Sequence, residues 1–146
     1  MSEQAIGIMG LAVCMILSGM GSAIGLYKTG SAAAGVLAED GKKFSKVIVL
    51  ALLPATQGIY GFVLAVMKLG LVADAATAVG WPLFMAMLAM GVNGLVSAFL
   101  QGRTAAACIY AVGKNAAGSG KYVLFPAMIE FYAILSLVLG IMINVG

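Results

Sequence analysis

Long stretches without charge are the feature that most limits what this sequence can fold into. Residues 4–27, 47–67 and 75–102 contain no Asp, Glu, Lys or Arg, and residues 122–146 contain one, Glu130. Each stretch can supply the roughly 20 residues that a helix needs to cross the hydrocarbon core of a membrane. Only 9% of the 146 residues are charged, against about 25% in a typical soluble domain. The sequence therefore predicts an integral membrane protein.

All four stretches are expected to form α-helices. A bilayer core offers no water to satisfy free backbone groups, so only helices and closed β-barrels cross it. The apolar residues run continuously, without the two-residue alternation of a barrel strand. We therefore predict an all-α membrane protein with four transmembrane helices. The first and third helices are expected to extend past the membrane surface through the alanine-rich segments Ser31–Ala34 and Thr104–Ala107.

The basic residues predict how the chain crosses a cell membrane. The second connection between helices has only Lys68 nearby, and the other basic residues border the first and third connections: Lys28, Lys42, Lys43, Lys46, Arg103, Lys114 and Lys121. Cytoplasmic loops carry an excess of Lys and Arg. We expect a multi-pass protein of the cell membrane, with connections 1–2 and 3–4 in the cytoplasm and both termini on the other side. The basic residues form no patch with interleaved aromatic side chains, so nucleic acid is not an expected partner.

The sequence contains an internal repeat. Pro54–Tyr60 aligns with Pro126–Tyr132 at an offset of 72 residues, and Ser31–Ala34 aligns with Thr104–Ala107 at an offset of 73. Such self-similarity is best recognised before the fold is assigned, because it defines the structural unit. The chain is therefore expected to form two tandem transmembrane hairpins, over residues 1–72 and 73–146.

Glu130 breaks the symmetry of this repeat, because Gly58 occupies the matching position in the first hairpin. It is the only charged residue deep in a predicted span, and Lys121, the nearest basic residue in the sequence, lies about 14 Å away along a helix. A carboxylate at membrane depth costs at least about 2.5 kcal/mol and normally marks an ion or proton path. The plainer interpretation is a protonated acid that donates a hydrogen bond between helices.

Polar residues near the middle of the second span extend this hypothesis. Gln57 lies midway between the charges that bound the span, with Thr56 beside it and Tyr60 one helical turn further along. Pro54 has no N–H to donate and loosens the helix around it. Backbone carbonyls near Leu53 could therefore turn toward a ligand.

Gln101 ends the third span, and its distance from Arg103 places it nearer the cytoplasmic surface than Glu130. One carboxylate with neutral amide and hydroxyl oxygens matches the charge of a hard monovalent cation, and we predict Na⁺ at Glu130. The alternative cargo is H⁺, with Gln57 and Gln101 serving only as hydrogen-bond partners. Amides that join helices are common in membrane bundles and contribute about 0.6 kcal/mol in measured cases.

Small residues on the first and third spans predict close helix packing. They are Gly21 and Gly25 on the first, and Gly91, Gly94, Ser97 and Ala98 on the third. Narrow faces of this kind let helix backbones approach in lipid, where apolar surface alone gives no drive to associate. They suit either ordinary packing within one bundle or a tightly packed ring.

A catalytic site of the kind found in soluble enzymes is not expected. The chain has no histidine to serve as the base of a nucleophile. Gly118–Lys121 lacks the earlier glycine and the following Ser or Thr of a phosphate-binding loop. Cys14 and Cys108 lie in apolar sequence, where a free cysteine behaves as a small hydrophobic residue.

These features together resemble the proteolipid rotor subunit, called c or K, of V-type and related A/V-type rotary ATPases. The similarity is strongest in Leu53–Phe62, Gln101–Arg103 and Ala127–Leu135, and the pattern is most similar to the sodium-translocating bacterial branch. The resemblance implies that Tyr60 hydrogen-bonds the carboxylate, and that Na⁺ is held by Glu130, Gln101, Gln57, Thr56 and the backbone carbonyl of Leu53.

The resemblance also implies an assembly. Identical subunits would form a homo-oligomeric rotor ring with helices one and three inside and helices two and four outside. A stator subunit with an essential arginine would face Glu130, beside central-stalk subunits and membrane lipid. The chain would be a non-catalytic subunit, and ring rotation would couple ATP hydrolysis to transport of Na⁺ or, alternatively, H⁺. A stand-alone four-helix exporter or structural tetraspan protein is the remoter alternative.

Overall fold

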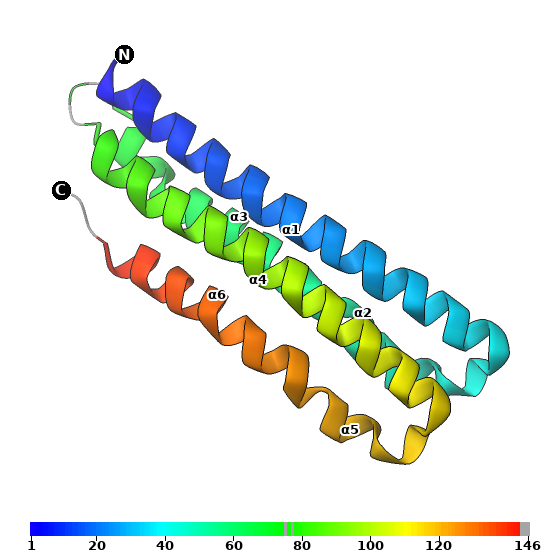
Figure 1. Ribbon diagram of the computed structural model, residues 1–146. Coiled ribbons are helices and arrows are strands. Elements are labelled where there is room, and N and C mark those ends of the chain that lie inside the picture. Colours follow the sequence, from blue (N-terminus) through cyan, green and yellow to red (C-terminus); the bar gives the residue numbers. More distant parts are fainter. Residues whose placement is uncertain (75, 77, 144–146) are drawn as a thin grey trace.

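Four membrane-length helical segments run back and forth along one axis in the computed structural model, which describes residues 1–74, 76 and 78–143 (Figure 1). The first and third segments are the continuous helices α1 (Glu3–Glu39) and α4 (Trp81–Lys114). The second segment comprises the 3₁₀ turn η1 (Gly41–Lys43), α2 (Phe44–Leu52), η2 (Leu53–Ala55), α3 (Thr56–Lys68) and η3 (Leu69–Val72). The fourth comprises η4 (Ala116–Gly118), α5 (Ser119–Tyr122) and α6 (Leu124–Met142). The predicted all-α fold is confirmed.

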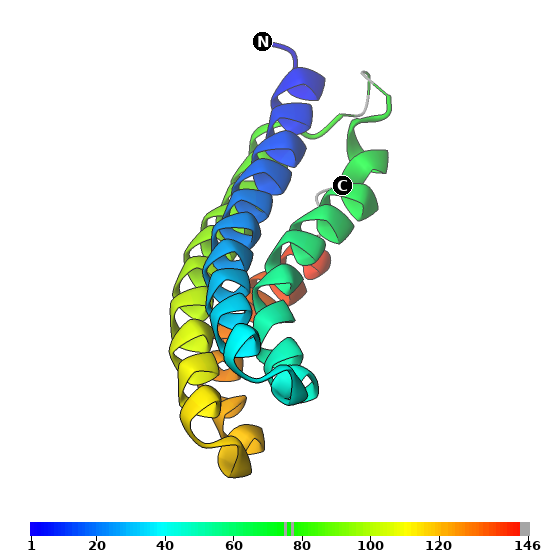
Figure 2. The ribbon, with the colours of Figure 1, turned by 90° about the vertical axis from the view of Figure 1, so that its right-hand side faces the viewer.

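The four segments form two layers. Helices α1 and α4 lie side by side in one layer, and the second layer holds α2, α3 and α6 (Figure 2). Helix α3 contacts both α1 and α4, whereas α6 contacts α4 and α3. The first two segments form one helical hairpin and the last two form a second, in the predicted order. Residues 75, 77 and 144–146 lie outside the described residues. The boundary at residues 72 and 73 stays a prediction.

Glycines permit the close approach of α1 and α4. A Cβ atom on Gly102 would lie 2.5 Å from the Cα of Gly25, and one on Gly21 would lie 2.6 Å from the Cα of Leu95. Both distances are too short for any side chain, since backbone atoms cannot move aside as a flexible side chain can. The small-residue faces predicted for close packing therefore meet within a single chain.

The turns that follow α1 and α4 are built alike, which shows the repeat in local structure. Asp40 and Asn115 both leave their helices with extended backbone, at φ −152° and −145°. The side chain of Asp40 accepts a hydrogen bond of 3.0 Å from Lys42 N, and that of Asn115 accepts one of 3.0 Å from Ala117 N. Short polar side chains of this type cap the start of a new helical turn.

Charged side chains are paired with helix ends of opposite partial charge. Glu3 accepts a hydrogen bond of 2.9 Å from Gly80 N at the start of α4, and Lys43 donates one of 2.8 Å to Gly113 O near the end of α4. Lys68 is only 5% exposed, and its ammonium group caps the end of α6 by donating to Ile141 O at 3.0 Å and Ile143 O at 2.7 Å. Cations stabilise helix C-termini, so Lys68 has a structural role at the end of the bundle that is otherwise poor in basic residues.

The outer surface of α6 is apolar, as contact with lipid or another apolar surface requires. Phe131 is 63% exposed and Leu135 is 62% exposed. The buried residues of α6 are few: Pro126, Ala133 and Gly140. Within the described residues, the fourth segment is therefore less buried by the rest of the chain than the other three.

Candidate ion-binding site

A 3₁₀ turn interrupts regular α-helix at Pro54, and this turn forms one wall of the site. Helix α2 ends at Leu52, the turn η2 carries Pro54, and α3 begins at Thr56. The Thr56 hydroxyl lies 3.0 Å from Leu53 O and 3.2 Å from Gln57 Oε1. A hydroxyl has one hydrogen to donate, so it can satisfy only one of these two oxygens at a time. The wall therefore presents more acceptor oxygens than donors.

Gln57 and Gln101 meet between α3 and α4, and both are fully buried. Gln57 Nε2 donates to Gln101 Oε1 at 2.8 Å and to the hydroxyl of Ser97 at 3.2 Å. Gln101 Nε2 in turn donates to Pro126 O at 3.1 Å and to Glu130 Oε2 at 3.3 Å. The two amides thus link the wall at Leu53 to the carboxylate on α6.

Glu130 closes the network from the opposite side and is half-buried. The hydroxyl of Tyr60 donates a hydrogen bond of 2.6 Å to its Oε1. Within the described part of the chain no Lys or Arg forms a salt bridge with it. The carboxylate therefore has polar neighbours but no protein cation to balance its charge.

The structure brings together all six residues singled out from the sequence. They form one continuous chain of hydrogen bonds that joins α3, α4 and α6: Leu53, Thr56, Gln57, Tyr60, Gln101 and Glu130. One carboxylate and several neutral oxygens suit a hard monovalent cation, since a charged carboxylate cancels one positive charge and the neutral oxygens can replace water ligands. The described residues contain no cluster of three or more His, Cys, Asp or Glu side chains that could hold a metal ion.

Gln101 was expected nearer the cytoplasmic surface than Glu130, and its amide lies beside Pro126, one turn from Glu130 toward Lys121, from where it reaches Glu130 Oε2. Helix α4 continues to Lys114, so the charge of Arg103 does not mark the end of the helix. The guanidinium of Arg103 lies over the ring of Phe99, 5.8 Å from its centre.

Sequence reasoning missed the polar role of Ser97, which it assigned to a narrow packing face. The Ser97 hydroxyl accepts from Gln57 and donates to Ile129 O at 3.2 Å. Ser97 stands one turn before Gln101 on α4, and this four-residue spacing was the available signal. Asn93, a further turn back, donates to Tyr132 O at 2.8 Å and to the hydroxyl of Ser136.

These polar side chains of α4 donate hydrogen bonds to backbone carbonyls of α6 at regular intervals. Successive turns of α4 reach successive carbonyls of α6 in antiparallel order, from Asn93 with Tyr132 O, through Ser97 with Ile129 O, to Gln101 with Pro126 O. Each contact ties a position along α4 to a position along α6. This series sets the register that places Glu130 beside Gln101.

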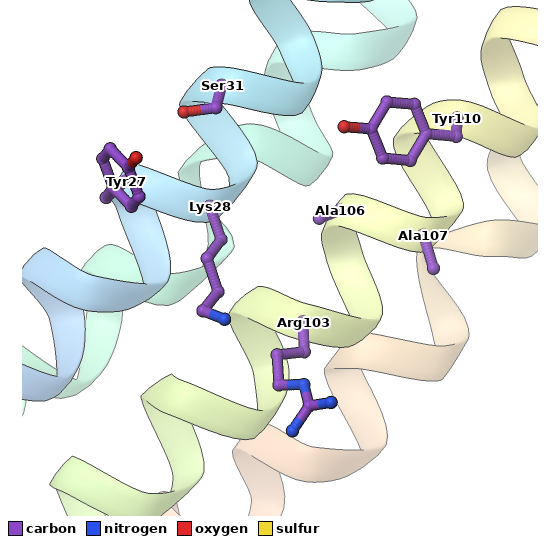
Figure 3. Close-up of a pocket in the computed structure, with 7 residues that line it drawn as sticks. All are labelled: Tyr27, Lys28, Ser31, Arg103, Ala106, Ala107 and Tyr110. Carbon is purple, nitrogen blue, oxygen red and sulfur yellow. The ribbon is translucent and has the colours of Figure 1, made fainter.

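A second polar feature lies outside this network, in a pocket between α1 and α4. Lys28 on α1 points toward the part of α4 that carries Arg103, and Tyr27 and Tyr110 flank the pocket (Figure 3). The Lys28 ammonium lies over the same Phe99 ring as Arg103, 5.1 Å from its centre. None of the six network residues lines this pocket, so it is a basic feature separate from the Glu130 network.

Comparison with known proteins is consistent with this geometry. A sequence model of the family described as the C subunit of ATP synthase matches residues 9–68 and again residues 84–143, one match in each helical hairpin. The V-type sodium ATPase subunit K of Enterococcus hirae is 38% identical over 137 residues, which make up 93% of this chain and 88% of that protein. The A-type ATP synthase subunit K of Methanocaldococcus jannaschii is 40% identical over 141 residues, which make up 97% of this chain and 62% of that protein.

Proposed function

Because this chain belongs to the family of ATP synthase C subunits, we propose that it is a rotor-ring subunit of a V-type rotary ATPase that binds Na⁺ at Glu130 and carries it across the membrane. The chain is a non-catalytic, ion-translocating subunit. ATP hydrolysis takes place elsewhere in the complex and drives rotation of the ring. The four membrane-length helical segments make the chain a multi-pass membrane protein.

The observation that carries the Na⁺ proposal is the oxygen-rich network around a single carboxylate. Glu130 supplies one negative charge, and the neutral oxygens come from Gln101, Gln57, Thr56 and Leu53. The 2.6 Å bond from Tyr60 is suited to hold the carboxylate in place while an ion is bound. A proton needs no oxygen cage. Similarity to a subunit K that belongs to a sodium ATPase supports the same cargo.

The proposed assembly is a ring of identical subunits that works with the other subunits of the ATPase. Helices α1 and α4 would line the inside, and the layer of α2, α3 and α6 would face outward. Glu130, half-buried on α6, would then face a stator subunit whose essential arginine displaces the ion. Central-stalk subunits and membrane lipid complete the proposed set of partners.

The proposed orientation follows from the charges at the two ends of the bundle. Lys42, Lys43 and Lys46 lie at the same end as Lys114 and Lys121, and the Lys28–Arg103 pocket lies toward that end. We place this end in the cytoplasm, in keeping with the positive-inside tendency. Lys68 at the other end is buried as the cap of α6, so it does not contradict this orientation. Both termini would lie on the non-cytoplasmic side.

Transport by the reconstituted complex tests the proposal. ATP-driven uptake of ²²Na⁺ into proteoliposomes should persist when a protonophore is added and should be lost in the variant Glu130→Gln. Glu39→Gln, which neutralises an exposed acid at the end of α1, is the matched control and should pump as the unmodified protein does. Transport that continues without Na⁺ and stops with a protonophore would select H⁺ as the cargo instead.

A further inference from the structure

An amide side chain presents oxygen at one end and nitrogen at the other, and only the oxygen can bind a cation. The buried amide of Gln57 therefore has one useful orientation and one harmful one. In the structure its Nε2 points to Ser97 and Gln101, and its Oε1 points to Thr56. Some feature of the protein has to impose this choice.

The backbone of α6 supplies a reason for the choice, because a carbonyl oxygen can only accept hydrogen bonds. Ser97 donates its single hydroxyl hydrogen to Ile129 O at 3.2 Å. With that hydrogen committed, its oxygen can only accept from Gln57, so it must face Nε2 and not Oε1.

A second carbonyl acts in the same sense through Gln101. Pro126 O accepts from Gln101 Nε2 at 3.1 Å, and the carboxylate of Glu130 accepts the other hydrogen of that group. Gln101 therefore turns its Oε1 toward Gln57, where it too can only accept. Ser97 and Gln101 therefore both direct an accepting oxygen toward Gln57 Nε2, because their own hydrogens are donated to oxygens of α6.

We propose that Ser97 is a positioning residue that passes the polarity of the Ile129 carbonyl to the Gln57 amide, so that the site presents oxygen to the cation. This inference rests on the proposed Na⁺ function and adds a residue that need not touch the ion. Loss of the Ser97 hydroxyl would leave Gln57 Nε2 with one hydrogen unpaired in a buried site. Gln101 Oε1 would then be the one remaining acceptor that opposes a flipped amide, with nitrogen toward the ion, so the flipped orientation becomes less unfavourable.

The test uses the intact ATPase and measures how Na⁺ protects Glu130 from a carbodiimide, which modifies protonated carboxyl groups. Ser97→Thr keeps the hydroxyl, and Ser97→Val has the same branched shape without it. We expect the two variants and the unmodified protein to be labelled at equal rates without Na⁺. The Na⁺ concentration for half-protection should rise at least tenfold in Ser97→Val and less than threefold in Ser97→Thr. Ser97→Ala replaces Ser97→Val if that variant does not assemble, with the same tenfold expectation.

The outcomes separate this inference from the proposed function. Equal shifts in Ser97→Thr and Ser97→Val would mean that shape and not the hydroxyl matters, and would overturn the role of Ser97 while leaving Na⁺ binding intact. Half-protection of Ser97→Val at the unmodified Na⁺ concentration would overturn it in the same way. Absence of Na⁺ protection in the unmodified protein would overturn the Na⁺ function and this role together.

Discussion

The phenol oxygen of Tyr60 on α3 and Oε1 of Glu130 on α6 are 2.6 Å apart, joined by a hydrogen bond that crosses between the two outer helices. Within the described residues, the other side-chain hydrogen bonds between α3 and the α6 segment are those that Lys68 donates at the end of α6. Both side chains are half-buried. In the structure the Glu130 carboxylate therefore lies between the Tyr60 hydroxyl and the Gln101 amide.

Replacement of Tyr60 by Phe removes this donor and keeps the ring. Hydrogen bonds to charged groups contribute about 1.5–3 kcal/mol when buried, and a half-exposed bond should lie at the low end. We expect bound ²²Na⁺ to leave the isolated ring roughly tenfold faster, since 1.4 kcal/mol corresponds to a factor of ten. A pulse-chase filtration assay measures this rate, and an unchanged rate would show that Tyr60 does not retain the ion.

Replacement of Gly102 by Ala should separate α1 from α4. The added Cβ would lie 2.5 Å from the Cα of Gly25, and overpacking of this kind typically costs about 1–3 kcal/mol. Gly35→Ala is the control, because a Cβ there has no neighbour within 4 Å and alanine favours the helix by about 0.5–1 kcal/mol. Thermal unfolding in detergent, followed by circular dichroism, should show a lower midpoint for Gly102→Ala alone. Equal midpoints would refute the close α1–α4 contact.

Replacement of Lys68 by Met keeps the aliphatic stem and removes the ammonium group that caps α6. The carbonyls of Ile141 and Ile143 lose their donor, so the last turn of α6 should fray. Amide hydrogen exchange near the end of α6 should accelerate about tenfold, while exchange near Glu130 stays the same. Lys68→Arg retains the charge and should remain close to the unmodified protein; if Lys68→Met also remains close to it, the cap does not stabilise the helix end.

Most of the fold could be predicted from the sequence, because a chain that crosses lipid can form only α-helices or a closed β-barrel. The uncharged stretches predicted four helices, and Pro54 indicated the irregular turn that the structure has at Leu53–Ala55. The alanine-rich segments predicted that α1 and α4 extend past the membrane surface. Both helices have more than 30 residues, whereas about 20 are enough to cross the hydrocarbon core. These features are local, so the residues that cause them are neighbours in the chain.

The site could be predicted only in part, because its final geometry depends on how two helices are aligned. The depth of Gln101 was judged from the nearest charge, and that estimate could not show that its amide reaches both Pro126 O and Glu130 Oε2. Ser97 was assigned to packing because a serine serves equally well as a small residue or as a hydroxyl, and only the position of Ile129 O distinguishes the two uses.

Equilibrium binding of ²²Na⁺ to the purified ring tests the central claim most directly. A single Glu130-centred site per chain predicts saturable binding of one Na⁺ per subunit, which Glu130→Gln abolishes and Glu39→Gln leaves unchanged. Binding that does not saturate, or that persists at the same stoichiometry in Glu130→Gln, would contradict the account.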